Sequence, residues 1–433
     1  MKTEPIIQKE LSELIHAAHS PFHCCSYIME QLTQNGFSPL TLKEPFFLEK
    51  GGKYVIRIFD TTILAVTIGR NVSNQNLPKL RMITAHTDWP GFVIKPNPVI
   101  TNEKYVRLNT EPYGGAVYHT WIDRPLGIAG KVCMKSADPF SPHIQLFDSQ
   151  KPVAIIPGLA IHMDKDINSE LKLNPQTHLL PLWMLEEKKE CTDFAAYLAN
   201  VLDCEKEDIL DYELFLYNCD SCESVGMNDE FFSAPRIDNS SGILSALDAV
   251  CSADTDNDLI CISAFYNNEE IGNMSKQGAD SRITEQILER IFSCLSLGKE
   301  ELYCSLNNGL CLSLDVAHAL HPAYSDKNDP TNRFCLGDGV CIKLSARQSY
   351  ATDSSFTSII QAICEKHGIP YAKFVNRSDQ RGGSTLGTVI SSSLCMPCVD
   401  AGVFLLSMHS ARELIAIRDQ VALCELSEKF FAK

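Results

Sequence analysis

The stretch Leu259-Ile-Cys-Ile-Ser-Ala-Phe-Tyr266 is apolar at almost every step and leads directly into Asn267-Asn-Glu-Glu270. A continuous apolar run of this length predicts a strand that is buried on both faces. Leu310-Cys-Leu-Ser-Leu314 and Pro397-Cys-Val-Asp-Ala-Gly-Val403 repeat the pattern, and stretches with helical spacing separate the runs. Strands that alternate with helices in this way predict an α/β domain built on a sheet with helices on both sides.

The sequence before residue 90 adds three more predicted strands, residues 54–59, 62–67 and 81–85. Helical spacing from Ile6 to Asn35, interrupted near Ser20-Pro21, predicts two packed helices ahead of them. Between Pro90 and about Val225 the texture changes to more proline, short alternating strands and several histidines. We therefore expect a mixed-sheet α/β catalytic domain, residues 1–89 and 227–433, interrupted by an inserted β-rich domain, residues 90–226.

Composition excludes several classes of protein. The net charge is -16 and no block of clustered lysine and arginine occurs, which argues against a nucleic-acid partner. The first 14 residues lack the apolar segment of an export signal, and no run of about 18 apolar residues is present. The 18 cysteines are scattered, and Cys219-x-x-Cys222 has no second pair to complete a zinc-finger spacing. We expect a cytoplasmic protein with reduced thiols and no membrane partner.

Acids and histidines fall where the predicted strands end. Because the carboxyl ends of strands in an open α/β sheet meet at one edge, these side chains are expected to converge on one cleft. Taken singly each has a plainer explanation, since a histidine at a strand end is usually structural and a pair of glutamates usually begins a solvated helix. Together they are more telling, because unpaired carboxylates after buried strands are costly unless a metal neutralises them. The residues are His86, Asp88, Asp238, Glu269, Glu270, Asp315 and His409.

The donor types fit a pair of divalent metal ions. Two ions about 3.5–4 Å apart need roughly three protein ligands each, commonly with one shared carboxylate. Asp88, two residues after His86, supplies a nearby carboxylate to fix the tautomer of that imidazole. Glu269 is left free as the general base, and zinc is the expected metal, with manganese and cobalt as alternatives that accept the same donors. The predicted ligands are His86, Asp238, Glu270, Asp315 and His409.

Ordered motifs along nearly the whole chain resemble those of the aspartyl aminopeptidase family of metallopeptidases, which includes the yeast vacuolar aminopeptidase I. The motifs that carry the resemblance are Ser20-Pro-Phe-His23, Thr84-Ala-His-Thr-Asp-Trp-Pro-Gly-Phe92, Asp123-Arg-Pro-Leu126, Leu159-Ala-Ile-His-Met163, Pro235-Arg-Ile-Asp-Asn239, Asn268-Glu-Glu-Ile-Gly272, Asp315-Val-Ala-His-Ala319, Asn376-Arg-Ser-Asp-Gln-Arg-Gly-Gly-Ser-Thr-Leu-Gly387 and Met408-His-Ser-Ala-Arg-Glu413.

The resemblance implies the same ligand set, with Asp238 as the bridge and Glu269 as the base. It also implies that the inserted domain dimerises and that dimers assemble into a tetrahedral dodecamer. A lone histidine such as His162 is usually structural, but in the family the matching residue reaches the partner's active site to stabilise the transition state. On that view an isolated subunit is nearly inactive.

Substrate-binding candidates come from the C-terminal third. Gly382 and Gly383 allow a peptide carbonyl to approach free N–H groups, although the loop could be only a flexible turn. Asp379 is a candidate to hold the substrate's ammonium group. The resemblance makes Lys343 and Arg347 candidates for binding an acidic side chain.

Two departures from the family pattern leave that preference open. Ser349 stands where some relatives have arginine. Trp89 stands where the family often has a small residue, so it either narrows the entrance or packs against a side chain.

These predictions together describe a metal-dependent aminopeptidase that releases acidic or neutral N-terminal residues from peptides. A metal-bridging hydroxide attacks, and Glu269 shuttles the proton. The alternatives are a related dinuclear hydrolase, such as a carboxypeptidase or deacylase, and a noncatalytic assembly protein on a peptidase scaffold. Comparing an N-acetylated peptide with its free-amine form separates the first alternative from an aminopeptidase.

Overall fold

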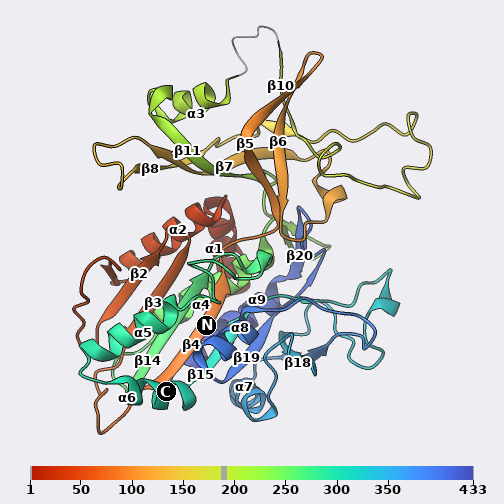
Figure 1. The fold of residues 1–433 in the computed structure, drawn as a ribbon. Helices are drawn as coiled ribbons and strands as arrows, with labels where there is room; N and C mark the ends of the chain where they lie inside the picture. The colour runs from red at the N-terminus through yellow and green to blue at the C-terminus, as the bar shows by residue number, and fades with distance from the viewer. Residues whose placement is uncertain (1, 187–192, 433) are drawn as a thin grey trace.

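The computed structural model describes residues 2–186 and 193–432, which form two sheets (Figure 1). The larger sheet has 13 strands and the smaller has seven. The smaller sheet stands above the larger one, and the chain crosses from one to the other directly after residue 86 (Figure 1). None of the helices in the described ranges is long and apolar enough to cross a membrane.

The larger sheet is mixed, as the sequence predicted. Its four central strands, β14, β4, β15 and β19, run parallel to one another, while β2, β3 and β17 run antiparallel to a neighbour. The strands are β1 Ser38–Leu40, β2 Lys53–Ile58, β3 Thr62–Ile68, β4 Lys79–His86, β12 Glu223–Val225, β13 Phe231–Ala234, β14 Leu259–Tyr266, β15 Leu310–Leu314, β16 Ala317–His318, β17 Val340–Leu344, β18 Tyr371–Val375, β19 Cys398–Leu406 and β20 Glu413–Ala416.

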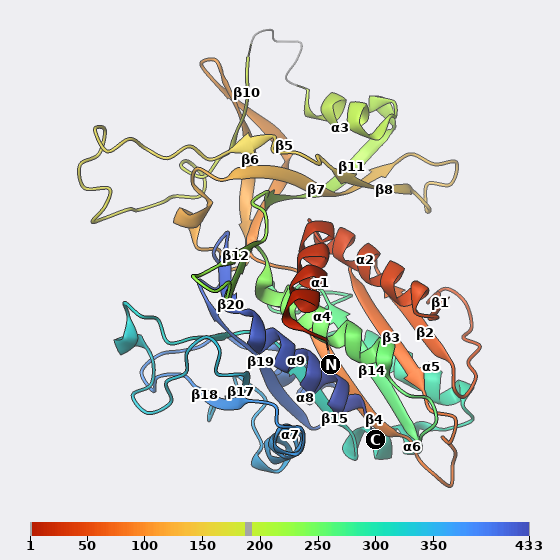
Figure 2. The ribbon, with the colours of Figure 1, turned by 180° about the vertical axis from the view of Figure 1, so that it is seen from behind.

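Helices cover both faces of this sheet, which explains the continuous apolar runs. Every residue of β14 is buried, and its side chains alternate between two separate cores. The first core also contains α1 Glu4–Ala17, α2 Pro21–Gln34, α4 Ile237–Ser252, α7 Ser354–His367 and α9 Ile417–Phe431, several of which face the viewer in Figure 2. The second contains α5 Ile283–Cys294, α6 Lys299–Asn307 and α8 Leu386–Leu394.

The two N-terminal helices are separated where the sequence predicted the break. Pro21 opens α2, where its missing N–H costs nothing, and the Ser20 side chain accepts the main-chain N–H of His23.

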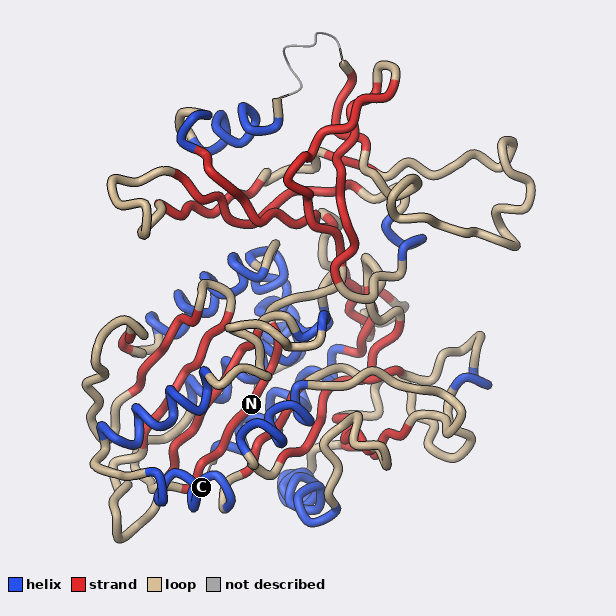
Figure 3. The backbone as a smooth tube through the Cα atoms, viewed as in Figure 1, coloured by secondary structure: helices blue, strands red, loops and turns tan. Residues whose placement is uncertain are grey.

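The smaller sheet lies wholly between residues 91 and 218 and has its own core. Its pairings run in a closed circuit through β7, β11, β5, β6, β10 and β9, with β8 added on β7. Long connections extend outward from it, drawn as tan loops in Figure 3. Its elements are β5 Gly91–Asn102, β6 Tyr105–Tyr113, η1 Tyr118–Trp121, β7 Pro125–Met134, β8 His143–Asp148, β9 Ala154–Ile155, β10 Leu182–Leu185, α3 Phe194–Leu202, η3 Lys206–Asp208 and β11 Ile209–Asn218.

The strand register brings the functional segments together. His86, the last residue of β4, pairs with Tyr266 at the end of β14, and Ser313 near the end of β15 pairs with Thr84. The segments that leave these strands therefore start at one edge of the larger sheet. The short helix η4 Glu269–Ile271 follows β14, and η5 Ser325–Lys327 follows β16.

Candidate metal centre

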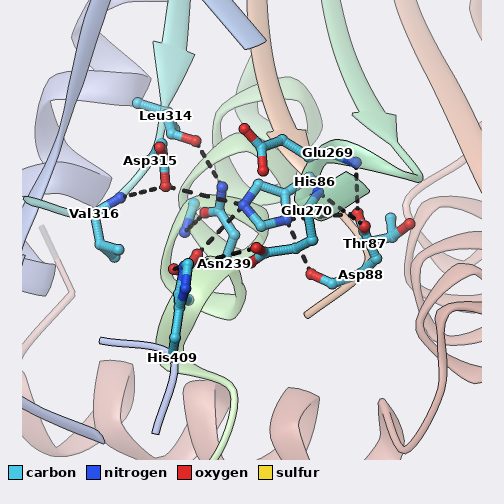
Figure 4. Close-up of polar contacts among 12 residues, drawn as sticks. His86, Thr87, Asp88, Asn239, Glu269, Glu270, Leu314, Asp315, Val316 and His409 are labelled. Carbon is cyan, nitrogen blue, oxygen red and sulfur yellow. Dashed lines mark hydrogen bonds and ion pairs between the residues drawn. The ribbon is translucent and has the colours of Figure 1, made fainter. Parts of the chain in front are cut away.

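His86 lies at the centre of a cluster of acids (Figure 4). Its ring is 2% exposed, and its Nε2 lies 3.3 Å from Asp238 Oδ1 and 3.9 Å from Asp315 Oδ1. Its Nδ1 lies 2.9 Å from the main-chain oxygen of Asp88. A proton on Nδ1 completes that contact, which leaves the Nε2 lone pair facing the acids, as a metal ligand requires.

The Asp88 carboxylate lies near the His86 imidazole, as the sequence suggested, and it also contacts the turn that follows β14. Its Oδ1 lies 3.7 Å from His86 Nδ1, whereas the main-chain oxygen of Asp88 lies closer to the same nitrogen, at 2.9 Å. Its Oδ1 accepts the main-chain N–H of Glu269 at 3.1 Å, and its Oδ2 accepts that of Glu270 at 3.2 Å. Asp88 therefore holds the turn that carries both glutamates.

Asp238 lies between the two histidines. Its Oδ1 faces His86, and its Oδ2 is 3.5 Å from His409 Nε2. Burial alone would raise the pKa of Asp238, but the neighbouring His409 and His86 imidazoles hold it well below its ordinary value. Asp238 begins α4 with non-helical backbone angles, so its carboxylate faces the strand ends. One carboxylate between two imidazoles is the arrangement of a bridging ligand.

Glu269 and Glu270 follow β14 on the short helix η4. Glu270 Oε2 lies 3.6 Å from His409 Nε2. Burial, with the Asp238 carboxylate, raises the pKa of Glu270 well above its ordinary value. Burial also raises the pKa of Glu269 to about 8, with His86 opposing the shift and Asp315 and Asp88 adding to it. The pKa values of these two neighbouring carboxyls are raised because both are buried close to other carboxylates, so the site carries a high density of acidic groups.

Asp315 follows β15 and already has a cationic partner. Its Oδ2 accepts the Lys343 ammonium at 2.9 Å, and its Oδ1 accepts the main-chain N–H of Val316 at 2.8 Å. Lys343 comes from β17 and is 2% exposed. Burial would lower the pKa of Lys343, but Asp315 together with Tyr350 and Asp400 raises it above its ordinary value. The predicted substrate-binding lysine therefore lies against a predicted metal ligand.

The cluster fits a divalent metal. Ligand atoms of His86, Asp238 and Glu270 lie within 4.8 Å of one another. Asp238 Oδ1 and Glu270 Oε1 are buried and have no hydrogen-bond partner, a costly arrangement unless a cation satisfies them. Imidazole nitrogens and carboxylate oxygens are the donors that zinc takes.

A cavity of about 510 Å³ opens over the cluster. Glu269, Lys343, Tyr350 and Gly383 line it together with the predicted ligands. Gly382 instead lines two neighbouring cavities, one of about 370 Å³ and one of about 640 Å³, and Arg347 lines the larger of these. The glycine pair thus lies between the metal cluster and further open space.

Three residues singled out from the sequence lie elsewhere in the subunit. His162 is exposed in the connection between β9 and β10, and it does not line the metal cavity. Asp379 is exposed and forms a two-pronged ion pair with Arg377, with N–O distances of 2.7 and 3.0 Å. Trp89 is 6% exposed and packs 5.5 Å from the Arg236 guanidinium, so it packs against a side chain and does not line the metal cavity.

Two residues with direct contacts to this cluster had no role assigned from the sequence. Glu413, 3% exposed, accepts the main-chain N–H of His409 at 2.9 Å and that of Asp238 at 3.0 Å. Burial and Asp238 raise the pKa of Glu413 to about 8, although its two N–H donors oppose the shift. Tyr113, at the end of β6, donates its hydroxyl to Asp88 Oδ2 at 2.8 Å. An acid in the otherwise apolar strand β20 was the available signal for Glu413, and nothing local marked Tyr113.

The chain is similar in sequence to known metallopeptidases over nearly its whole length. The family model described as aminopeptidase I zinc metalloprotease (M18) matches residues 14–431. A probable M18 family aminopeptidase 2 of Clostridium novyi (strain NT) is 39% identical over 437 residues and covers 100% of both chains. Its counterpart in Clostridium acetobutylicum is 38% identical over 438 residues, again covering 100% of both.

Solved structures share the whole fold. In the cryo-EM structure of the Ape4 and Nbr1 complex, the matching chain has a TM-score of 0.94 and 28% identity, covering 99% of this chain and 86% of that one. The structure of the S. cerevisiae mApe1 dodecamer has a TM-score of 0.83 and 25% identity, covering 99% and 95%. Both sheets are therefore present in these relatives.

Proposed function

The chain belongs to the M18 family of zinc metalloproteases and is an aminopeptidase, and from this premise we propose that it removes single N-terminal residues from peptides at a two-metal centre. The observation that supports the proposal is the Asp238 carboxylate, which lies between two imidazoles and has one buried oxygen without a hydrogen-bond partner. When bound, the ions polarise the scissile carbonyl and lower the pKa of a water molecule.

We assign the five proposed ligands to two groups that share Asp238. His86 lies near Asp315, at 3.9 Å, and His409 lies near Glu270, at 3.6 Å. Each group with Asp238 offers three donors, the number that a catalytic ion needs while keeping a position open. Zinc is the proposed occupant of both positions.

Glu269 is the proposed general base. It lines the metal cavity, while its neighbour Glu270 faces His409. Glu269 takes a proton from the attacking water and delivers it to the departing amine. The Asp88 carboxylate fixes the main chain of both glutamates, which keeps base and ligand on their separate sides.

We propose that acidic N-terminal residues are preferred and neutral ones are accepted. Lys343 is the charged group that supports this, since its ammonium is buried beside the cavity. Gly383 lines the same cavity and is placed for a peptide carbonyl, with Gly382 beside it. Asp379 is kept as a lower-ranked candidate for the substrate's ammonium group, since Arg377 already engages its carboxylate.

The proposed assembly is a tetrahedral dodecamer built from dimers, in which the two subunits pair through the inserted domain, residues 90–226. A related mApe1 structure is described as a dodecamer. The connection that carries His162 also exposes apolar side chains, including Leu159, Ile161 and Met163, a composition suited to contact with another subunit. His162 is proposed to act in the partner's site. The cytoplasmic location stays a prediction from the sequence.

The decisive experiment is hydrolysis of peptides with N-terminal Asp, Glu, Leu or Lys by zinc-loaded protein. Glu269→Gln should lower kcat by about 10²- to 10⁴-fold without loss of bound zinc. The exposed Glu207→Gln is the matched control. Zinc removal by a chelator should abolish activity, and restored zinc should return it. Full activity of Glu269→Gln would contradict the proposed mechanism, and cleavage of N-acetylated peptides would contradict an aminopeptidase.

A further inference from the structure

One segment of the smaller sheet reaches the metal cluster of the larger one. It comprises residues 113–117, directly after β6. At its start, the Tyr113 hydroxyl donates to Asp88 Oδ2 at 2.8 Å and accepts the Asn268 side-chain amide at 3.0 Å. Asp88 is fully buried, so no water replaces a partner that is lost. The hydroxyl therefore joins the two residues that flank the Glu269–Glu270 turn in space.

The other hydrogen bonds of Asn268 fix the orientation of its side chain toward Tyr113. Asn268 has a left-handed backbone with φ of 67°, and its side-chain oxygen accepts the Ser275 hydroxyl at 2.8 Å and the Gln277 amide at 3.0 Å. Its amide group is then directed to Tyr113, which fixes which end of the side chain faces the phenol. A phenylalanine at position 113 would remove one hydrogen-bond partner from the Asn268 side-chain amide and one from Asp88 Oδ2.

The same segment also touches the other half of the cluster. A side chain at Gly114 would place its Cβ 3.1 Å from the Glu270 Cβ, and Gly114 has φ of 67°, so the close approach requires glycine. The Gly115 carbonyl lies 3.2 Å from His409 Nδ1. The Val117 N–H donates to the His409 carbonyl at 3.0 Å.

We propose that Tyr113 is a positioning residue of the metal centre, acting through Asp88 to hold Glu269 and Glu270 at their working places. This inference rests on the proposed function, because it assigns Glu270 as a ligand and Glu269 as the base. On this proposal the inserted sheet supports the metal centre in addition to its proposed role in assembly, because residues 113–117 contact both Glu270 and His409. The Gly115 carbonyl is placed to accept a hydrogen bond from the Nδ1–H group of His409, which would leave Nε2 available to bind a metal ion.

The hydroxyl can be separated from the rest of the tyrosine. The Tyr113 ring packs edge-on against Phe215, with ring centroids 5.6 Å apart, and phenylalanine keeps that contact. Tyr212 provides a matched control within the same sheet, because its hydroxyl donates to the Lys95 carbonyl at 2.8 Å, away from the cluster. Each of Tyr113→Phe and Tyr212→Phe loses one hydrogen-bonded hydroxyl.

The test compares wild type, Tyr113→Phe and Tyr212→Phe in three measurements. These are the zinc dissociation constant by competition with a chromogenic chelator, the thermal midpoint of the metal-free chain, and kcat and KM at saturating zinc. Tyr113→Phe is expected to weaken zinc binding by about 10- to 100-fold and to lower kcat with little change in KM. Its metal-free midpoint is expected to lie somewhat below that of Tyr212→Phe, because buried Asp88 and Asn268 each lose a hydrogen-bond partner.

Each other outcome has a defined meaning. Zinc affinity and kcat equal to those of Tyr212→Phe would refute the positioning role. Failure of Tyr113→Phe to fold would also refute it, because the hydroxyl would then hold the fold and not the centre. Wild-type protein without zinc-dependent activity would instead refute the proposed function, which keeps the two failures distinct.

Discussion

Glu413→Gln tests whether one buried carboxylate holds two ligand segments in place. Its two oxygens accept the main-chain N–H groups of His409 and Asp238 at 2.9 and 3.0 Å. Glutamine fills the same space but has one oxygen, so its NH₂ group faces one of those donors. A hydrogen bond to a charged acceptor contributes about 1.5–3 kcal/mol, and we expect the variant to be destabilised by about that amount.

The assay is urea unfolding of the zinc-loaded chain followed by tryptophan fluorescence. The metal matters because burial and Asp238 raise the pKa of Glu413 to about 8, so in the metal-free chain the buried charge itself opposes folding at high pH and would mask the lost hydrogen bond. Glu207→Gln is the exposed control. The zinc dissociation constant should rise by about 10- to 100-fold, since the loosened segments carry two of the ligands. The reasoning is refuted if Glu413→Gln matches the control in both stability and zinc affinity.

Three further predictions use independent parts of the molecule. Lys343→Met should lower the ratio of kcat/KM for Asp- over Leu-peptides by about 10- to 100-fold, the loss of one charge-assisted hydrogen bond; an unchanged ratio would remove Lys343 from the specificity site. Burial would raise the pKa of Asp148, but hydrogen bonds from His19, the Gln150 main chain and Tyr217 lower it to about 2. The pair of Asp148 and His19 therefore stabilises the fold above about pH 4, and this stabilisation is lost as the pH falls toward 2. The stability difference between wild type and Asp148→Asn should therefore shrink from pH 6 to pH 3, measured by urea unfolding, and a constant difference would exclude the pair as its source. Mixing inactive His162→Ala with inactive Glu269→Gln should restore about a quarter of wild-type activity if His162 acts in the partner's site of a dimer, whereas no recovery would place His162 in its own subunit or outside the chemistry.

The sequence predicted the central strands well because burial on both faces leaves a signal in consecutive residues. Residues 259–266 and 310–314 have the predicted bounds. Parallel strands then force their carboxyl ends together, so a list of residues after strands became a cluster in space. The five predicted ligands belong to that cluster because their positions follow from the sheet.

Contacts that depend on the path of the main chain could not be predicted. His86 and Asp88 are two residues apart, which suggested a carboxylate near an imidazole, but not that the Asp88 main-chain oxygen would lie closer to that ring. Tyr113 lies 25 residues from Asp88 at the end of a strand in the other sheet, and only the packing of the two sheets shows that they touch. The ion pair between Lys343 and Asp315 likewise depends on β17 lying antiparallel to β19.

The order of the ligands along the chain sets when activity can first exist during synthesis. His86 is made before the inserted sheet, and Asp238, Glu270, Asp315 and His409 follow it at long intervals. A growing chain that has just completed the inserted sheet carries one ligand of the five, and the position shared by His409 and Glu270 waits for the segment before β20. If the five proposed ligands form the centre, peptide hydrolysis can begin only after His409 has been synthesised, so shorter unfinished chains carry no complete centre with which to cleave peptides.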